Sequence, residues 1–296
     1  MINTRRTAKS SPMWSLDKIY KHIHTFYGLA GRAESIYALM ARERRDRIMQ
    51  AELAADPRNV VAYGFTAYSQ ADEDGIVAEI FNRIGVTDRR FIEFGCGDGM
   101  ENNSTYLLLT GWTGLWMDGS ESNVNTIRSE FGAYTADRRL VMNQVFITRE
   151  NINSLISSAG FSGEVDFLSI DIDGNDYWLW EALTAVRARV VAIEYNATFR
   201  PPVAVVQEYN PAHVWHSNNA FGASLSALTA LGEKLGYVLV GCCYAGTNAF
   251  FVRQDLEGGK FSAPFTAEHH YREPMYDAYV RGFTRHRRAV GNYRVL

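Results

Sequence analysis

The sequence predicts an α/β protein built on a doubly wound, mostly parallel seven-stranded sheet. Three observations support this fold class. Strand and helix patterns alternate between residues 90 and 195, a glycine-rich loop follows the first of these strands, and two apolar runs joined by a short turn come last. The chain has 296 residues, 47% hydrophobic and 21% charged. This composition excludes disordered and fibrous proteins and leaves room for one large domain or two modest ones.

Helical patterns come before the sheet. In residues 32–55 the apolar side chains recur at mostly helical spacing, and Pro57 follows the end of the pattern. We therefore expect helices in residues 14–55 and a helical accessory segment over residues 1–60.

The central part of the chain alternates between strands and helices. A helix capped by Ser69 and ending before Gly85 is expected before the first strand. The predicted strands are residues 90–94, 114–117, 140–147, 165–172 and 190–195. The predicted helices between them are residues 101–110, 121–131, 150–159 and 177–185. This order implies parallel strands with helices on both faces of the sheet.

The alternation stops after Tyr195. A long connection precedes the next predicted helix, residues 224–235, and a connection of that length in a compact fold is usually functional. Two further strands, residues 237–241 and 248–252, are joined by the turn 244–247. So short a link predicts an antiparallel hairpin at the end of the sheet.

Charge is segregated along the chain. Residues 1–60 hold 11 basic and 6 acidic side chains, residues 257–296 hold 7 and 4, and residues 61–256 hold 12 and 23. The basic residues at both ends are interleaved with acidic or apolar ones, which favours solvated or packing faces over nucleic-acid contact. We expect a main domain over 61–256 and a basic C-terminal extension over 257–296. We expect no nucleic-acid partner, and the N-terminal helices leave open a homo-oligomer.

Two features bear on the compartment. No apolar run approaches the length of a membrane span, and the first six residues lack the apolar stretch of a secretory signal. Cys96, Cys242 and Cys243 cannot form a disulfide framework and have no zinc-site spacing. We therefore expect a cytoplasmic protein.

The sharpest motif is a buried strand that runs into a glycine loop. Gly95, Gly97 and Gly99 permit a tight turn and a close approach of backbone to a ligand. Their G-x-G-x-G spacing differs from the dinucleotide fingerprint, so a pyrophosphate is not expected. Asp118 ends the next strand, nineteen residues after Gly99, where a carboxylate can accept both hydroxyls of a ribose.

Over about residues 70–253 the chain resembles the class I S-adenosylmethionine (SAM)-dependent methyltransferases. The resemblance implies their Rossmann-like fold and SAM as cofactor. Carried over by position, Glu93 would lie near the cofactor's amino-acid end through water or backbone groups. Asp118 would hold the ribose, whereas Thr148 matches the adenine side only loosely. The expected cofactor contacts are Glu93, Gly95, Gly97, Gly99, Asn103, Asp118, Gly119 and Thr148.

Acidic side chains follow the next two strands. Asp171 and Asp173 alternate onto one face at the carboxyl end of a strand, where two carboxylates can bracket a metal ion or serve as a base. Glu194 ends the following strand at the same edge. These strand ends resemble the FkbM-type branch of the methyltransferases, which acts largely on hydroxyl groups of sugars and natural products. Asp173 is a departure, because the common form of that branch has Glu there.

The long connection contributes two histidines, His213 and His216. A lone histidine is more often structural than catalytic. Two of them beside Trp215, close to the predicted active edge of the sheet, favour a functional role. We choose His216 as the candidate base because Ser217 and two asparagines follow it.

These features predict a SAM-dependent O-methyltransferase that acts on a hydroxyl of a sugar, a glycan or a glycosylated natural product, as in polysaccharide biosynthesis. The hydroxyl is weakly acidic and needs a base or a metal. Asp171, Asp173, Glu194 and His216 can supply either, and the three carboxylates are the expected ligands of Mg²⁺ or another divalent metal. The alternatives are an NAD-dependent sugar oxidoreductase and a non-catalytic methyltransferase-like scaffold that binds partners through its basic helical ends.

Overall fold

The computed structural model describes residues 16–275 and 287–296. The parts of the predicted terminal segments at 1–15 and 276–286 lie outside the described residues. By its internal contacts the chain divides into two compact units, Met1–Arg45 and Asp46–Leu296. No helix among the described residues is both long and apolar enough to cross a membrane.

One continuous helix, α1 (Leu16–Ala55), occupies most of the N-terminal segment. Its last ten residues belong to the second unit, together with the short 3-10 helix η1 (Val60–Tyr63). Val60 and Val61 are fully buried, and a Cβ at Gly241 would come within 2.5 Å of Val61. The second unit therefore begins fifteen residues before the predicted boundary at 61, because this segment supplies part of its core.

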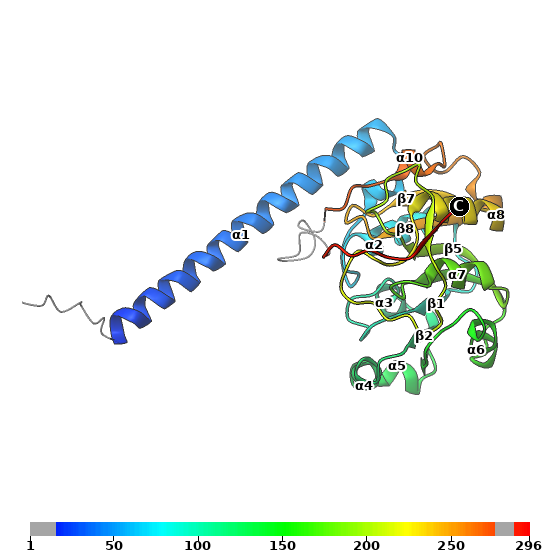
Figure 1. Ribbon diagram of the computed structural model, residues 1–296, viewed down its shortest axis with the longest axis horizontal. Helices are drawn as coiled ribbons and strands as arrows, with labels where there is room; N and C mark the ends of the chain where they lie inside the picture. The colour runs from blue at the N-terminus through cyan, green and yellow to red at the C-terminus, as the bar shows by residue number, and fades with distance from the viewer. Residues whose placement is uncertain (1–15, 276–286) are drawn as a thin grey trace, which may run out of the picture. The chain divides into compact units, whose positions relative to one another are not determined.

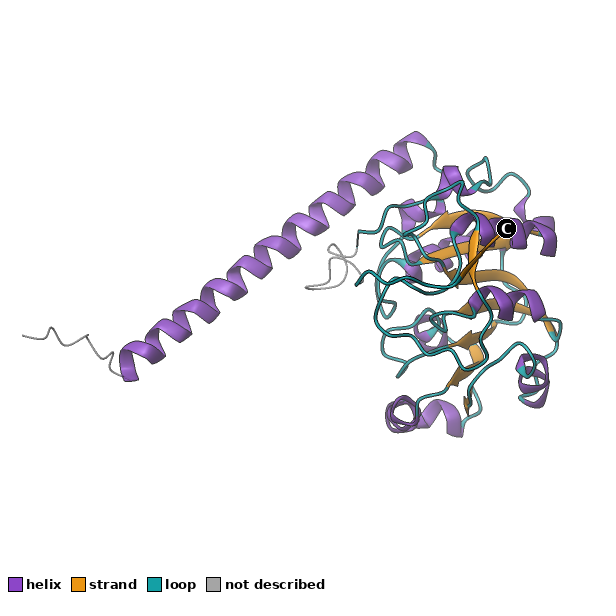
Figure 2. Ribbon diagram, in the orientation of Figure 1, coloured by secondary structure: helices purple, strands orange, loops and turns teal. Residues whose placement is uncertain are grey.

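The second unit contains the predicted seven-stranded sheet, drawn in orange in Figure 2. The strand order is β3-β2-β1-β4-β5-β8-β7, with β8 antiparallel to both neighbours and the other pairs parallel. The strands are β1 (Arg90–Phe94), β2 (Thr113–Asp118), β3 (Leu140–Gln144), β4 (Gly163–Ile170), β5 (Val186–Glu194), β7 (Tyr237–Cys242) and β8 (Asn248–Arg253). This confirms the expected Rossmann-like methyltransferase fold.

Helices cover both faces of this sheet (Figure 1). They are α2 (Glu73–Ile84), α3 (Thr105–Leu109), α4 (Glu121–Glu130), α5 (Gly132–Ala136), α6 (Ile152–Ser158), α7 (Asp176–Ala182), α8 (Leu225–Leu235), α9 (Gln254–Glu257) and α10 (Ala267–His270). On one face Trp180 packs against Phe251, with ring centroids 4.9 Å apart. On the other, Trp116 meets Phe131 at 5.0 Å. Alternate strand residues thus feed two separate cores.

The start of α2 differs from the prediction. Asp72, not Ser69, occupies the N-cap position. The carboxylate of Asp74 accepts the backbone N–H groups of Ala67, Tyr68 and Ser69 at 2.6 to 2.8 Å. These three bonds hold the segment around Ser69 in a loop, so the helix cannot begin there.

A second, two-stranded sheet was not predicted. The strand β6 (Val205–Gln207) pairs antiparallel with β9 (Tyr293–Val295). Each strand has only three residues and its partner lies far away in sequence, so neither gives a local alternation signal. The pairing attaches the end of the chain to the long connection after β5.

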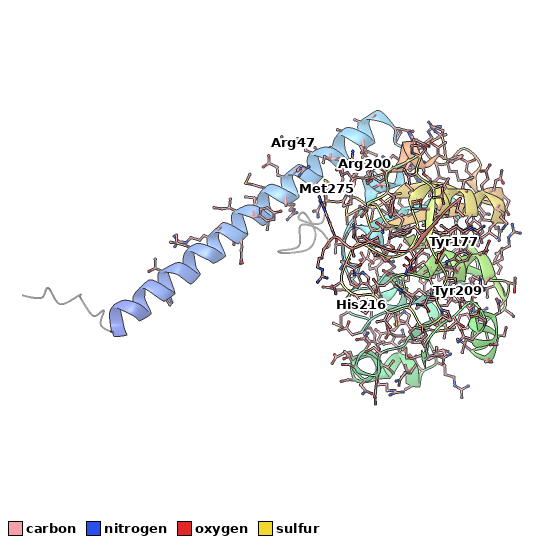
Figure 3. The ribbon with its side chains drawn as sticks, in the orientation of Figure 1. Arg47, Tyr177, Arg200, Tyr209, His216 and Met275 are labelled. Carbon is pink, nitrogen blue, oxygen red and sulfur yellow. The ribbon has the colours of Figure 1, made fainter. Side chains whose placement is uncertain are left out.

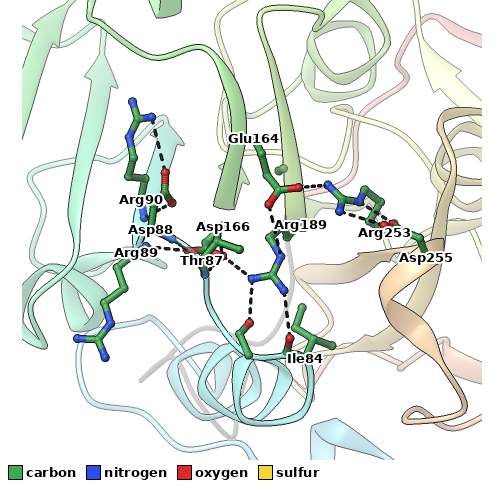
Figure 4. Close-up of polar contacts among 12 residues, drawn as sticks. Ile84, Thr87, Asp88, Arg89, Arg90, Glu164, Asp166, Arg189, Arg253 and Asp255 are labelled. Atoms are coloured by element: carbon green, nitrogen blue, oxygen red, sulfur yellow. Dashed lines mark hydrogen bonds and ion pairs between the residues drawn. The ribbon is translucent and has the colours of Figure 1, made fainter.

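At the amino ends of β4 and β5 a buried ion pair ties a loop to the sheet (Figure 4). Arg189 on β5 donates to Asp166 on β4 at 2.7 Å, and both side chains are almost inaccessible. Asp166 also accepts the backbone N–H groups of Thr87 and Arg89, while Arg189 donates to the carbonyl of Ile84. Both charges of this buried pair therefore have partners.

Candidate active site

A cavity of about 520 Å³ lies at the carboxyl ends of the central strands. This is the edge where open α/β sheets bind ligands, and the volume suits a small molecule. Its lining consists of Gln70, Gly95, Gly97, Met117, Asp118, Gly119, Asn123, Val145, Phe146, Ile147, Asp171, Ile172, Asp173, Asn175, Glu194, His213, Trp215 and Thr247.

The glycine loop forms one wall of the cavity. Gly95 has φ 70°, and a Cβ there would fall 1.6 Å from the carbonyl oxygen of Asp171. Gly97 has φ 57° with open space around it. Glycine is therefore favoured at this position by the left-handed backbone and not by a lack of room for a side chain. Gly99 packs on Trp116 and does not line the cavity. Two of the three glycines thus face the cavity.

Asp118 braces the glycine loop. Its Oδ2 accepts the N–H of Gly97 at 3.0 Å, and its Oδ1 accepts from Ser120 N at 2.7 Å and from Asn123 Nδ2 at 3.2 Å. A carboxylate oxygen has two lone pairs, so one acceptor position on Oδ2 is left for a ligand. Asp118 therefore keeps an acceptor position beside the cavity, and its contact with a ribose stays a prediction.

Glu93 and Asn103 lie behind the cavity rather than in it. Glu93 is buried, and it accepts the N–H of Asn103 at 2.9 Å and the hydroxyl of Ser104. Burial raises the pKa of Glu93 to about 7, although these hydrogen bonds oppose the rise. The side chain of Asn103 donates to Ser169 on β4 at 3.0 Å. Both residues shape the segment between β1 and α3. A role for Glu93 through water or backbone groups, as expected from the resemblance, stays a prediction.

The wall beyond β3 also differs from expectation. Thr148 is not a lining residue, because its N–H is bonded to Asn151 Oδ1 at 2.8 Å at the start of α6. Val145, Phe146 and Ile147 line the cavity instead, and Phe146 exposes 50% of its surface. Their apolar pattern continues that of β3, so the predicted strand runs to residue 147, whereas β3 ends at Gln144.

Three predicted carboxylates meet on the opposite wall. Asp171, Asp173 and Glu194 each offer an oxygen, and these oxygens lie within 4.8 Å of one another. The Oε2 atom of Glu194 is buried without a hydrogen-bond partner. Burial and the neighbouring carboxylates raise the pKa values of Asp171 and Glu194 well above their usual range, and burial raises that of Asp173. We call these three residues the acid cluster.

The loop that carries the acid cluster is held in an uncommon conformation. Asp173 has φ 56°, a left-handed backbone that few non-glycine residues adopt. Asp176 accepts the N–H groups of Ile172 and Gly174, each at 2.8 Å. Burial raises the pKa of Asp176 to about 6. Its backbone bonds fix the loop and direct Asp173 toward the cavity.

The structure brings His213, and not His216, to the acid cluster. His213 Nδ1 lies 2.9 Å from Gln207 Nε2, and its Nε2 lies 3.0 Å from the carbonyl oxygen of Asp173. Both ring nitrogens of His213 are therefore engaged by the loop, one by the Gln207 amide and the other by the Asp173 carbonyl. A Cβ at Gly174 would lie 2.3 Å from this ring, so the histidine packs where only glycine fits.

His216, labelled in Figure 3, is exposed and lines a neighbouring cavity. It does not line the first cavity, and its role as a base stays a prediction. His213 supports the loop at Asp173, and the sequence signal that distinguishes it is the glycine at 174, which the ring covers.

The chain matches no protein-family model and no curated protein. Its solved structural neighbours include an S-adenosylmethionine-dependent methyltransferase from Clostridium acetobutylicum, 9% identical, covering 71% of this chain and 98% of that one with a TM-score of 0.40. They also include the mitomycin 7-O-methyltransferase MmcR (14% identity, 60% and 53%, TM-score 0.34). A third is the glycopeptide N-methyltransferase MtfA in complex with sinefungin (14% identity, 62% and 87%, TM-score 0.36). The function proposed below rests on the residues of the cavity and not on these similarities.

Proposed function

We propose that this chain is a SAM-dependent methyltransferase that methylates a hydroxyl of a sugar, a glycan or a glycosylated natural product. One observation carries the proposal. A single cavity has a glycine loop with a ribose-type acceptor on one wall and three clustered carboxylates on the other. Among the described residues that line it, four are acidic and none is lysine or arginine. Such a cavity calls for positively charged occupants.

The residues of the first wall fit the cofactor. Gly97 has open space beside its backbone, and Asp118 keeps one acceptor position on Oδ2. The half-exposed ring of Phe146 offers an apolar face for the adenine of the cofactor. When bound, SAM supplies an electrophilic methyl group on a cationic sulfur. The acidic lining favours that positive charge, whereas a dinucleotide would place a pyrophosphate against carboxylates. This disfavours the NAD-dependent alternative.

The residues of the second wall fit a divalent cation. Carboxylate oxygens are the preferred ligands of Mg²⁺ and Mn²⁺, and Asp171, Asp173 and Glu194 would hold the ion. A bound cation supplies charge stabilisation for an ionising hydroxyl. Without a metal, an ionised carboxylate of the acid cluster takes the hydroxyl proton as the oxygen bonds to the methyl carbon and the carbon–sulfur bond breaks. In both versions His213 positions Asp173 through its carbonyl oxygen.

The cofactor assignment is tested by calorimetry with S-adenosylhomocysteine. Asp118→Asn should weaken binding by about 1.5 to 3 kcal/mol, the range for a hydrogen bond to a charged group. Asp98→Asn is the matched control, because it removes a charge from the same loop outside the cavity. Binding of NAD in place of S-adenosylhomocysteine would overturn the proposal.

The reaction is tested by S-adenosylhomocysteine formation with nucleotide sugars and short glycans, with and without EDTA. Metal assistance predicts loss of turnover in EDTA and recovery with Mg²⁺ or Mn²⁺. A carboxylate base predicts no effect of EDTA. Methylation of amines but not of hydroxyls in the same assay would contradict the oxygen acceptor.

A further inference from the structure

A second cavity, of about 360 Å³, adjoins the first. His213 lines both, so the two cavities meet at the residue that supports Asp173. One side of the second cavity comes from the long connection after β5, and the other from the C-terminal segment that ends in β9. We propose that this cavity is an acceptor subsite that binds a neutral polyhydroxylated unit next to the one being methylated, an inference that rests on the proposed function.

The C-terminal wall is tied to the strand that carries Glu194. The hydroxyl of Tyr293 accepts from Asn196 Nδ2 at 3.2 Å and from the N–H of Phe221 at 3.0 Å, and it lies 3.2 Å from the carbonyl oxygen of Asn219. Asn196 comes two residues after Glu194. One phenol therefore joins the end of β5, the long connection and the C-terminal segment.

Backbone bonds complete this wall. Glu208 N donates to the carbonyl of Asn292 at 2.9 Å, and Ala289 N donates to Asn219 Oδ1 at 2.8 Å. The first bond continues the pairing of β6 with β9, and the second joins the C-terminal segment to the long connection. The C-terminal segment is thus an ordered part of the second cavity and sits where an acceptor would leave the acid cluster.

The lining chemistry selects the ligand class. The second cavity presents a carboxylate from Glu208, an imidazole from His216 and side-chain amides from Asn210, Asn218 and Asn292. Among its described lining residues there is no lysine or arginine. Mixed donors and acceptors pair well with sugar hydroxyls, which are both at once. A phosphate or carboxylate on the ligand would face Glu208 with no cation to offset it.

This arrangement gives the residues here a different role from that of the acid cluster. They contact a part of the acceptor that does not react, so they contribute binding and not chemistry. Removing them should raise KM for an acceptor with two or more sugar units and leave kcat almost unchanged. An acceptor of one unit should not respond, because it occupies only the first cavity.

The direct test uses saturation-transfer NMR with cellotriose, maltotriose and chitotriose beside their monosaccharides. We expect at least one trisaccharide to bind the wild-type chain, and His216→Ala combined with Asn292→Ala to weaken that binding about tenfold or more. Asn125→Ala, on exposed α4, is the matched control. Failure of all three trisaccharides to bind, or preference for a sugar phosphate, overturns the proposal.

Tyr293→Phe is the second variant, because it removes only the hydroxyl that joins the three segments. It should weaken trisaccharide binding while S-adenosylhomocysteine affinity stays within twofold. An equal loss for the monosaccharide and the trisaccharide would show a general structural effect and contradict the subsite. If the wild-type chain does not bind S-adenosylhomocysteine, the proposed function itself is refuted. Failure of the subsite and failure of the proposed function can therefore be told apart.

Discussion

The two ends of β4 and β5 both carry acidic side chains, but only the acid at the amino ends has a cationic partner. At the amino ends Asp166 faces Arg189, and the pair is enclosed by backbone donors and acceptors. At the carboxyl ends Asp171 and Glu194 face each other and Asp173, with no cation among the described lining residues. The same two strands thus hold a satisfied ion pair at one end and an unsatisfied acid cluster at the other.

Proton affinity follows this difference. Burial alone would raise the pKa of Asp166, but hydrogen bonds from Arg189 and from backbone N–H groups lower it overall. Burial and mutual repulsion raise the pKa values of Asp171 and Glu194. Uncompensated buried acids cost stability, and such groups are concentrated at functional sites. The comparison therefore assigns stability to one end and chemistry to the other.

The largest effect is expected at the carboxyl ends. Asp171→Asn and Glu194→Gln should each reduce turnover by about 10² to 10⁴, the range for losing a group that assists proton transfer. Because each change removes a charge that repels its neighbours, stability should not fall. Turnover and thermal melting measure the two outcomes, with the exposed Glu121→Gln, outside the cavity, as the control. Lower melting temperature with full turnover would reverse the comparison.

The amino ends should respond in the opposite way. Arg189→Met leaves Asp166 buried without its cation and should cost about 3 to 5 kcal/mol of unfolding free energy. Adding Asp166→Asn should recover part of that loss, because the orphaned charge is removed. Urea denaturation gives both values. Additive destabilisation in the double variant would argue against the ion pair.

A smaller effect is expected at Glu93, which lies on β1 beside Ser169 of β4. Its folded pKa of about 7 lies above the usual 4.5, so the unfolded chain loses this proton first as pH rises. The contribution of Glu93 to the free energy of unfolding is therefore fully present below pH 4.5. It falls by up to about 3 kcal/mol as the pH rises toward 7. Glu93→Gln should flatten this part of the stability–pH curve. An unchanged slope would mean that Glu93 is ionised throughout.

The smallest effect is expected from deleting the first unit, residues 1–45. Affinity for S-adenosylhomocysteine should stay within twofold, because every lining residue lies in the second unit. A fall in oligomer mass by light scattering would support a homo-oligomer through the N-terminal helix. A folded truncation that does not bind S-adenosylhomocysteine would contradict this assignment.

Local patterns explain what the sequence could predict. The buried strands β1 to β5, the glycine loop and the acids at the strand ends are each defined by a short run of residues, and the structure has them in place. The pairing of β6 with β9 depends on residues far apart in the chain. The choice between His213 and His216 depends on the space above Gly174. Neither follows from periodicity.

Glu93 and Asp118 show a further limit. Their positions relative to the glycine loop fit a cofactor contact, but the sequence does not reveal which hydrogen bonds a carboxylate already makes. Glu93 is occupied by Asn103 and Ser104, and Asp118 is largely occupied by the loop itself. A sequence motif locates a carboxylate, but its hydrogen-bond partners are seen only in the structure.

The contact between Gly95 and the carbonyl of Asp171 has an evolutionary consequence. Any side chain at 95 would push β1 and β4 apart, so the main chain itself sets the spacing between the glycine loop and the acid cluster. Natural variation can therefore alter the long connection and the C-terminal segment without retuning this spacing. Descendants of this protein could change their acceptors by exchanging those surface parts while inheriting an unchanged reaction centre.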